Sequence, residues 1–142
     1  MAIIQTLTTS FKVEVAQGLH NFTTGTGDVF KLALYTANAD LGASTTAYTA
    51  AGESSGANYT AGGIILTNIT PSFQGTTSYW SFQDATFTNV TLTTNGALIY
   101  NSTNGNRSVA VLNFGVNITK TAQNFVITFP VNDATNAVLR IA

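Results

Sequence analysis

The spacing of hydrophobic residues changes near Asp28, and this change constrains the fold more than any other feature of the sequence. Residues 30–35 then read Phe-Lys-Leu-Ala-Leu-Tyr, in which large apolar side chains take every second position. Side chains of a β-strand point alternately to the two faces of a sheet. The run therefore predicts a strand with one buried face.

Further short apolar runs, each bounded by Gly, Asn, Pro or Thr, follow along the chain. We expect strands near residues 64–69, 78–82, 86–93, 97–101, 107–114, 125–129 and 137–141. Seven or eight short strands at this spacing are typical of a mainly β fold, either an antiparallel β-sandwich or a jelly-roll-like barrel. A chain of 142 residues has the usual size of one domain, so a single β domain is expected over residues 1–142.

One hairpin can be placed from its turn. The dipeptide Asn104-Gly105 lies between the runs at 97–101 and 107–114. It tolerates the positive φ angles that tight turns need. We therefore expect these two runs to pair across it.

Residues 10–22 are the best candidate for a helix. Phe11 and Val15 lie four positions apart and would share one helical face. Ser10 can cap the N-terminus, and Gly18 is a candidate stop signal. One short N-terminal helix is expected here.

Residues 37–63 are expected to form a long loop. The segment contains mostly Ala, Ser, Thr, Gly and Tyr, with Leu41 as its one large aliphatic residue. A loop of this length is usually functional or held by a partner. Its Tyr48 and Tyr59 either contact a partner, since tyrosine offers contact area at low entropic cost, or pin the loop onto the sandwich.

Residues 1–9 form a possible N-terminal arm. Their aliphatic side chains need burial, and no obvious turn returns them to the core. The segment either reaches a neighbouring subunit or forms an edge strand. In the first case, removal of residues 2–7 should weaken partner binding without unfolding the domain. The predicted subunit-contact residues are Ile3, Ile4 and Leu7 of this arm and Tyr48 and Tyr59 of the long loop.

Charge excludes two classes of partner. Charged residues make up only 8% of the chain, and the net charge is -1. The five Lys and Arg residues are scattered and form no basic stripe, so we expect no nucleic-acid partner. No apolar run approaches the roughly 18 residues of a spanning helix, and little positive charge is available for anionic lipid. We expect no membrane partner either.

The sequence contains no pattern typical of a catalytic, cofactor or metal site. It has no cysteine, and His20, its only histidine, is interpreted as a capping or packing residue at a helix end. The six acidic residues are isolated in sequence, so we expect solvated turn or cap residues. Metal-ligand spacings are absent. The chain is therefore predicted to be non-enzymatic, with no catalytic residue, no cofactor and no metal.

An aromatic cluster raises the alternative of a carbohydrate-binding or adhesion module. Tyr79, Trp80 and Phe82 could form the flat platform that such a module needs. Alternation places Trp80 and Phe82 on one face of the strand and Tyr79 on the other. The side chains of Trp80 and Phe82 are therefore expected in the core.

Several segments in order resemble a family of small structural proteins of tailed bacteriophages. They lie at residues 8–12, 30–36, 47–49, 52–53, 59–63, 96–102, 109–114, 125–130 and 136–142. Typical examples are Phe30-Lys31-Leu32-Ala33-Leu34-Tyr35-Thr36 and Tyr59-Thr60-Ala61-Gly62-Gly63. The resemblance covers nearly the whole chain, and none of these segments is a catalytic signature.

The resemblance implies a non-enzymatic protein of the virion. Its most concrete form is a decoration, or cement, protein that binds the major capsid protein on the outer head lattice. The resemblance also favours a homo-oligomer, preferably a trimer. A tail, connector or fibre-associated role is the alternative within the same class.

Overall fold

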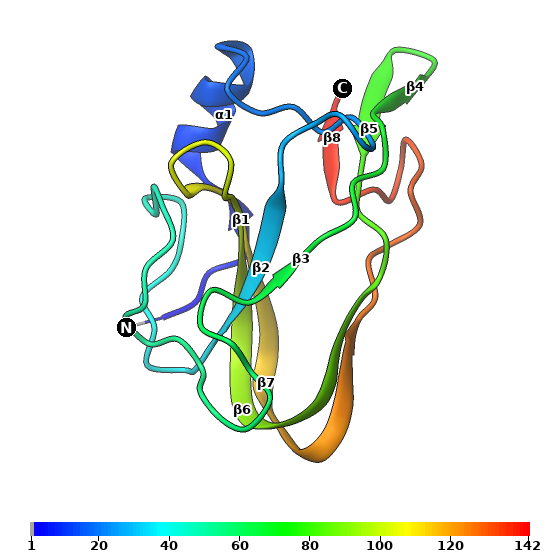
Figure 1. Cartoon of the computed structure of the whole chain (residues 1–142). Helices are drawn as coiled ribbons and strands as arrows, with labels where there is room; N and C mark the ends of the chain where they lie inside the picture. Colours follow the sequence, from blue (N-terminus) through cyan, green and yellow to red (C-terminus); the bar gives the residue numbers. More distant parts are fainter. Residues whose placement is uncertain (1) are drawn as a thin grey trace.

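The computed structural model describes residues 2–142 as a mainly β protein with one short helix (Figure 1). The elements are β1 (Thr6–Leu7), α1 (Thr9–Ala16), β2 (Phe30–Tyr35), β3 (Ile64–Ile65), β4 (Ser72–Gln74), β5 (Thr77–Trp80), β6 (Ala85–Asn101), β7 (Arg107–Ile127) and β8 (Leu139–Ile141). They form two antiparallel sheets, ordered β1-β7-β6-β2-β3 and β4-β5-β8. The predicted mainly β sandwich with a short helix is confirmed, and the described strands do not close into a barrel.

One long hairpin builds most of the sandwich. β6 and β7 pair from Asn101 and Arg107 at the turn to Ala85 and Ile127 at the far end. Their register shifts repeatedly along the middle of β6. Such bulges bend a strand and increase its twist, and Figure 1 shows the hairpin curling back on itself. Both of its ends therefore contribute side chains to one main core.

The length of this hairpin was not predicted. Three expected short strands, 86–93, 97–101 and 107–114, are parts of β6 and β7, and the fourth, 125–129, lies in β7 only up to Ile127. The prediction was wrong because residues typical of turns lie at bulges inside the strands. Asn89 and Gly115 have φ angles of 52° and 80°, yet the ladder resumes after each. The predicted turn at Asn104-Gly105 is confirmed, with φ of 65° at Gly105.

β2 lies inside the five-stranded sheet, and both of its faces are buried. Its even-numbered residues enter the main core, while Ala33 and Tyr35 enter a smaller second cluster. The prediction of a single buried face was wrong, because the N-terminal segment and the long loop cover the other face. Ile3 and Leu41 belong to this second cluster and form a parallel bridge.

The three-stranded sheet lies at one end of the molecule (Figure 1). Trp80 and Phe82 are buried in the main core, as their alternation predicted. β4 was not predicted, and all three of its residues are exposed. The runs expected at 64–69 and 137–141 shorten to β3 and β8, because their remaining residues leave the ladders.

α1 begins and ends earlier than predicted. Thr8, not Ser10, caps its N-terminus, and the Thr8 hydroxyl accepts the N–H of Phe11 at 3.4 Å. Thr8 is fully buried, so tertiary packing decides which hydroxyl takes this position. The helix ends at Ala16, and Gly18 adopts a φ of 73°, the left-handed conformation expected of a stop signal.

The close packing at Gly96 is testable. A Cβ atom there would lie 2.5 Å from the Leu112 carbonyl oxygen and 2.8 Å from Ile3 Cγ2. Gly96→Ala should therefore lower the free energy of unfolding by about 1–3 kcal/mol, the usual cost of overpacking. Gly42→Ala is the control, because its Cβ meets only Ile4 Cβ at 3.8 Å. Urea unfolding followed by circular dichroism compares them, and equal effects would contradict the packing described.

Candidate functional site

The Glu53 carboxylate anchors the long loop. The hydroxyl of Tyr48 donates to its Oε2 at 2.6 Å, and the hydroxyl of Tyr59 donates to its Oε1 at 2.7 Å. The Gly62 N–H also donates to Oε1 at 2.7 Å. The Tyr59 oxygen in turn accepts the N–H of Leu34 at 2.9 Å, which ties the loop to β2. One carboxylate thus joins three points of the loop to one another, and Tyr59 ties them to the sheet.

Two tyrosines of the sheet complete this cluster. The hydroxyl of Tyr35 donates to the carbonyl oxygen of Thr49 at 2.6 Å, and that of Tyr100 donates to Gly62 at 2.6 Å. The rings of Tyr48 and Tyr100 stack with their centroids 4.9 Å apart. The sheet thus donates hydrogen bonds to the loop from Leu34, Tyr35 and Tyr100, which fixes the path of loop residues that carry little apolar surface.

Burial and the nearby carboxylate keep these phenols neutral. Desolvation, followed by the hydrogen bond and negative charge of Glu53, raises the pKa of Tyr48 to about 12. Desolvation is also the main cause that raises the pKa of Tyr35, Tyr59 and Tyr100. A neutral phenol donates a hydrogen bond to the carboxylate, so the cluster stabilises the position of the loop.

The positions of Tyr48 and Tyr59 match the second alternative raised by the sequence, in which these tyrosines pin the long loop onto the sandwich. Both are half-buried, and both use their hydroxyls within the chain. Their contact with a partner subunit stays a prediction.

The N-terminal segment lies along the edge of the five-stranded sheet. Thr6 and Leu7 pair with β7, and Leu7 is half-buried against the main core. Ile3 is only 6% exposed, whereas Ile4 is 61% exposed. The placement matches an edge strand, the alternative to a reaching arm. Of the predicted contact residues in this segment, Ile4 offers its side chain to solvent, and its contact with a partner stays a prediction.

A chain of polar contacts joins α1 to the turn of the long hairpin. His20 Nε2 lies 3.0 Å from Glu14 Oε1, and Arg107 donates to the other oxygen of this carboxylate at 2.8 Å. His20 Nδ1 lies 3.1 Å from Asn101 Nδ2, which also donates to Asp28 at 2.8 Å. Sequence reasoning did not find this network, because its members come from segments far apart in the chain.

The network assigns the roles of the two ring nitrogens of His20. The Asn101 side-chain oxygen accepts the N–H groups of Thr103 and Asn104, both at 3.1 Å, so its amide nitrogen faces the ring. This nitrogen donates to Nδ1, which leaves the proton of a neutral His20 on Nε2, toward Glu14. Both ring nitrogens are engaged and the side chain is 0% exposed, which suits the structural interpretation of this histidine.

The expectation of solvated acidic residues holds only in part. It is wrong for Glu14, which is buried in its ion pair with Arg107, and for Glu53 among its tyrosines. Asp133 matches it: its carboxylate is exposed in a local turn, where hydrogen bonds from Asn136, then from the backbone of Thr135, lower its pKa. The two exceptions are satisfied by groups that no local sequence signal reveals.

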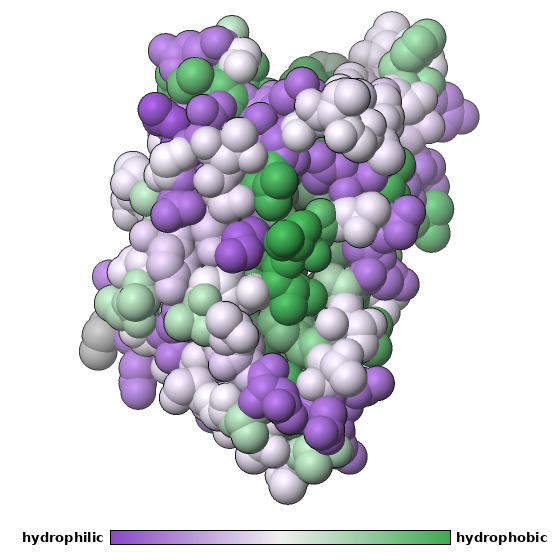
Figure 2. Space-filling model, in the orientation of Figure 1, coloured by the Kyte–Doolittle hydropathy of each residue, from purple (hydrophilic) through white to green (hydrophobic). Residues whose placement is uncertain are grey.

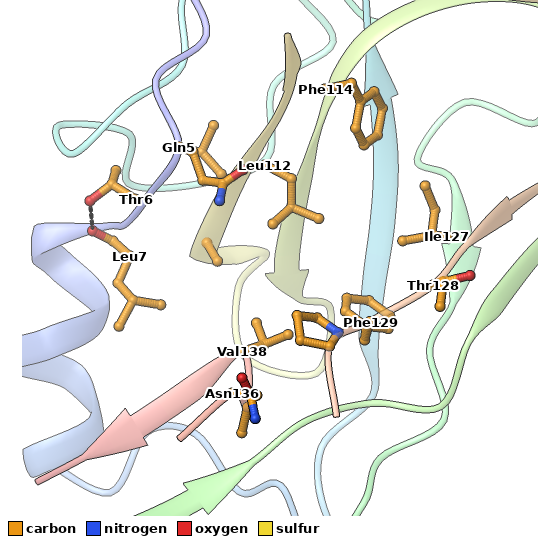
Figure 3. A pocket seen from close by; sticks show the side chains of 14 residues that line it. Gln5, Thr6, Leu7, Leu112, Phe114, Ile127, Thr128, Phe129, Asn136 and Val138 are labelled. Atoms are coloured by element: carbon orange, nitrogen blue, oxygen red, sulfur yellow. Dashed lines mark hydrogen bonds between the residues drawn. The ribbon is translucent and has the colours of Figure 1, made fainter. Parts of the chain in front are cut away.

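An apolar groove of about 530 Å³ opens along the outer edge of β7 (Figure 3). Its walls are residues 5–7, 110–112, 114, 127–130 and 136–138. Leu112, Phe114 and Val138 are half-buried in it and pack on the main core. The groove is therefore a place where the core reaches the surface. Of the predicted contact residues, only Leu7 lines it.

The groove exists because β7 is poorly covered on its outer side. β1 pairs with β7 only at Val111 and Ala110, and from Leu112 onward no other described strand adjoins this edge. Four separate segments form the walls, and only their tertiary arrangement brings them together. The only sequence signal for this region was the alternation of apolar residues in the 107–114 run. It predicted buried side chains and gave no indication of a groove.

Other large apolar side chains reach the surface elsewhere. Figure 2 shows a hydrophobic stripe over β3, where Ile65 is 66% exposed at the opposite edge of the five-stranded sheet. Phe73 on β4 is 75% exposed. Neither residue was selected from the sequence, because isolated apolar residues at short strands give no clear pattern.

Within residues 2–142, no group of three or more His, Asp or Glu side chains is arranged to hold a metal ion. In the same part of the chain, no helix has the length and hydrophobicity needed to cross a membrane.

Neighbouring isoleucines test the placement of the N-terminal segment. Ile3→Ala should lower the free energy of unfolding by about 2–5 kcal/mol, because it leaves a cavity in the second cluster. Ile4→Ala, the matched control at an exposed position, should change it by less than about 0.5 kcal/mol. We also expect removal of residues 2–7 to destabilise the domain, as the edge-strand alternative implies and the reaching-arm alternative does not. Equal urea midpoints for the two variants would refute the burial of Ile3.

High pH tests the tyrosine cluster. The pKa of Tyr48 rises from 10.0 to about 12 on folding, so the unfolded chain loses this proton first. The stabilisation is therefore complete below pH 10 and is lost as the pH rises toward 12. Tyr48→Phe should weaken the decline in unfolding free energy over this interval. Tyr79→Phe, on β5 outside the cluster, should leave the decline as it is, and urea unfolding at several pH values measures both.

No protein-family model, no curated protein and no solved structure matches this chain.

Proposed function

We propose that this chain is a non-catalytic structural protein of a tailed-phage virion, and most concretely a decoration protein on the outer surface of the head. The sequence resemblance supplies the virion setting. The structure supports an assembly role through one observation, the uncharged groove where Leu112 and Phe114 carry the main core to the surface. Apolar surface of this kind is typical of protein–protein contact sites.

The proposed partners are the major capsid protein and further copies of the chain itself, with a trimer preferred on the resemblance. Apolar contact suits the composition, because only 8% of the residues are charged. A tail, connector or fibre-associated role shares these arguments and is the alternative. A carbohydrate-binding platform is less favoured, because Trp80 and Phe82 are buried.

Immunoelectron microscopy of the virus that encodes the chain tests this function. Gold-labelled antibody raised against the purified chain should decorate the heads of intact particles. The label should persist after a wash at about 1 M NaCl, because apolar contacts, unlike exposed ion pairs, are not screened by salt.

Controls and contrary outcomes are distinct. Particles treated with pre-immune serum should carry no gold. Label on tails alone would overturn the decoration role in favour of the alternative. A chain that is made in infected cells and is absent from purified particles would overturn the virion role altogether.

A further inference from the structure

Phe73 forms an apolar knob at one end of the molecule. It is the most exposed large hydrophobic side chain among residues 2–142, at 75%. Its cross-strand neighbour is Ser78, which is too small to cover the ring. The strand that carries it is exposed throughout, and the β4–β5 hairpin projects at the upper edge of Figure 1. Within residues 2–142, most of this ring is therefore left open to water.

The groove beside β7 matches this knob in chemistry. None of its lining residues is charged, and none of residues 72–80 of the hairpin is charged. A charged segment would lose its hydration in the groove and find no ion pair there. The volume of about 530 Å³ lies within the range of pockets that hold small molecules, which leaves room for one phenyl ring. Phe114 and Phe129 offer aromatic walls to such a ring.

We propose that the groove of one copy of this chain binds the Phe73 hairpin of a second copy. The occupant is a second copy because the chain itself carries an exposed, uncharged aromatic knob that suits an uncharged groove. Knob and groove are different surfaces, and repeated contact between them closes a symmetric assembly when the rotation between copies permits. The inference rests on the self-association part of the proposed function, and it does not depend on the virion setting.

Addition of a partner strand to the edge of β7 is an alternative mode of contact, and the structure favours it less. Gly115 and Ala122 have φ angles of 80° and 48°, and both interrupt the regular edge. Ahead of Gly115, the N–H of Asn113 is already bound by the side chain of Gln5 at 3.1 Å. Only short stretches of backbone remain for a ladder, so a side chain that enters the groove fits the site better than an added strand does.

Sedimentation equilibrium of the purified full-length chain tests the contact. The wild type should self-associate, and Phe73→Ser should weaken the association constant by about 30-fold, as loss of an interface anchor does. Thr128→Arg should do the same from the other side, because it places a charge at an exposed position of the groove wall. Val13→Ser, at an exposed position of α1, is the matched control and should associate as the wild type does. Circular dichroism checks that each variant is folded.

A mixture of the two variants identifies the pair of surfaces. Phe73→Ser retains its groove and Thr128→Arg retains its knob, so the mixture should form a two-chain complex at concentrations where each variant alone is still monomeric. Because the chain has no cysteine, Gln74→Cys, which leaves the neighbouring Phe73 ring in place, should also be joined to Thr128→Cys by a short bis-maleimide reagent. Val13→Cys mixed with Thr128→Cys should not be joined.

Three results would overturn the proposal. The first is a wild type that stays monomeric up to about 1 mM, the range in which only very weak contacts form. The second is association that Phe73→Ser and Thr128→Arg leave unchanged. The third is a Thr128→Arg variant that associates normally but is no longer detected on the particle by the gold-labelled antibody. That result would assign the groove to another virion protein. Failure of the gold labelling alone would contradict the virion setting and leave this contact supported.

Discussion

The structure depends on the bending of one hairpin. If β6 and β7 ran straight, their apolar side chains would line one flat ribbon with little to pack against. The register shifts around Val90 turn the ribbon back on itself, so that Phe87 and Phe125 at one end and Ile99 and Val109 at the other join a single core. β2 pairs with the half of β6 that lies next to the hairpin turn, and the three-stranded sheet covers one end of the molecule. A single long-range pairing thus provides both layers of the sandwich.

The same bend explains why the surface is incomplete. A ribbon that curls without closing leaves a free edge, and β1 covers only two residues of it. The core is therefore exposed at the groove, between Leu112 in the half of the hairpin that contains the turn and Ile127 at the opposite end of β7. Closure of the barrel would remove this opening. An open sandwich with few charges keeps an apolar edge, which is the physical basis of the assembly role proposed for it.

The opposite face of the sheet shows how a polar loop can be held without much apolar burial. Residues 37–63 contribute few large side chains, so hydrophobic packing alone would order them weakly. Instead, Glu53 collects three hydrogen bonds, and Tyr35 and Tyr100 bind loop carbonyls from the sheet. Hydrogen bonds to a charged acceptor are stronger than neutral ones, which allows one carboxylate to organise many residues. The tyrosines that suggested a binding surface are used within the fold.

The sequence alone determined the features that arise from local pattern. Alternation identified β2 and the burial of Trp80 and Phe82, the Asn104-Gly105 dipeptide located the hairpin turn, and composition indicated a β protein with few charged residues. Tertiary structure alone decided which side of each element meets another segment. It placed Ile3 over Gly96, joined His20 to Glu14 and Asn101, and left the groove open. The physical reason is that alternation reports only that one side of a strand needs burial, whereas the distant segment that supplies or withholds it depends on how the long hairpin bends.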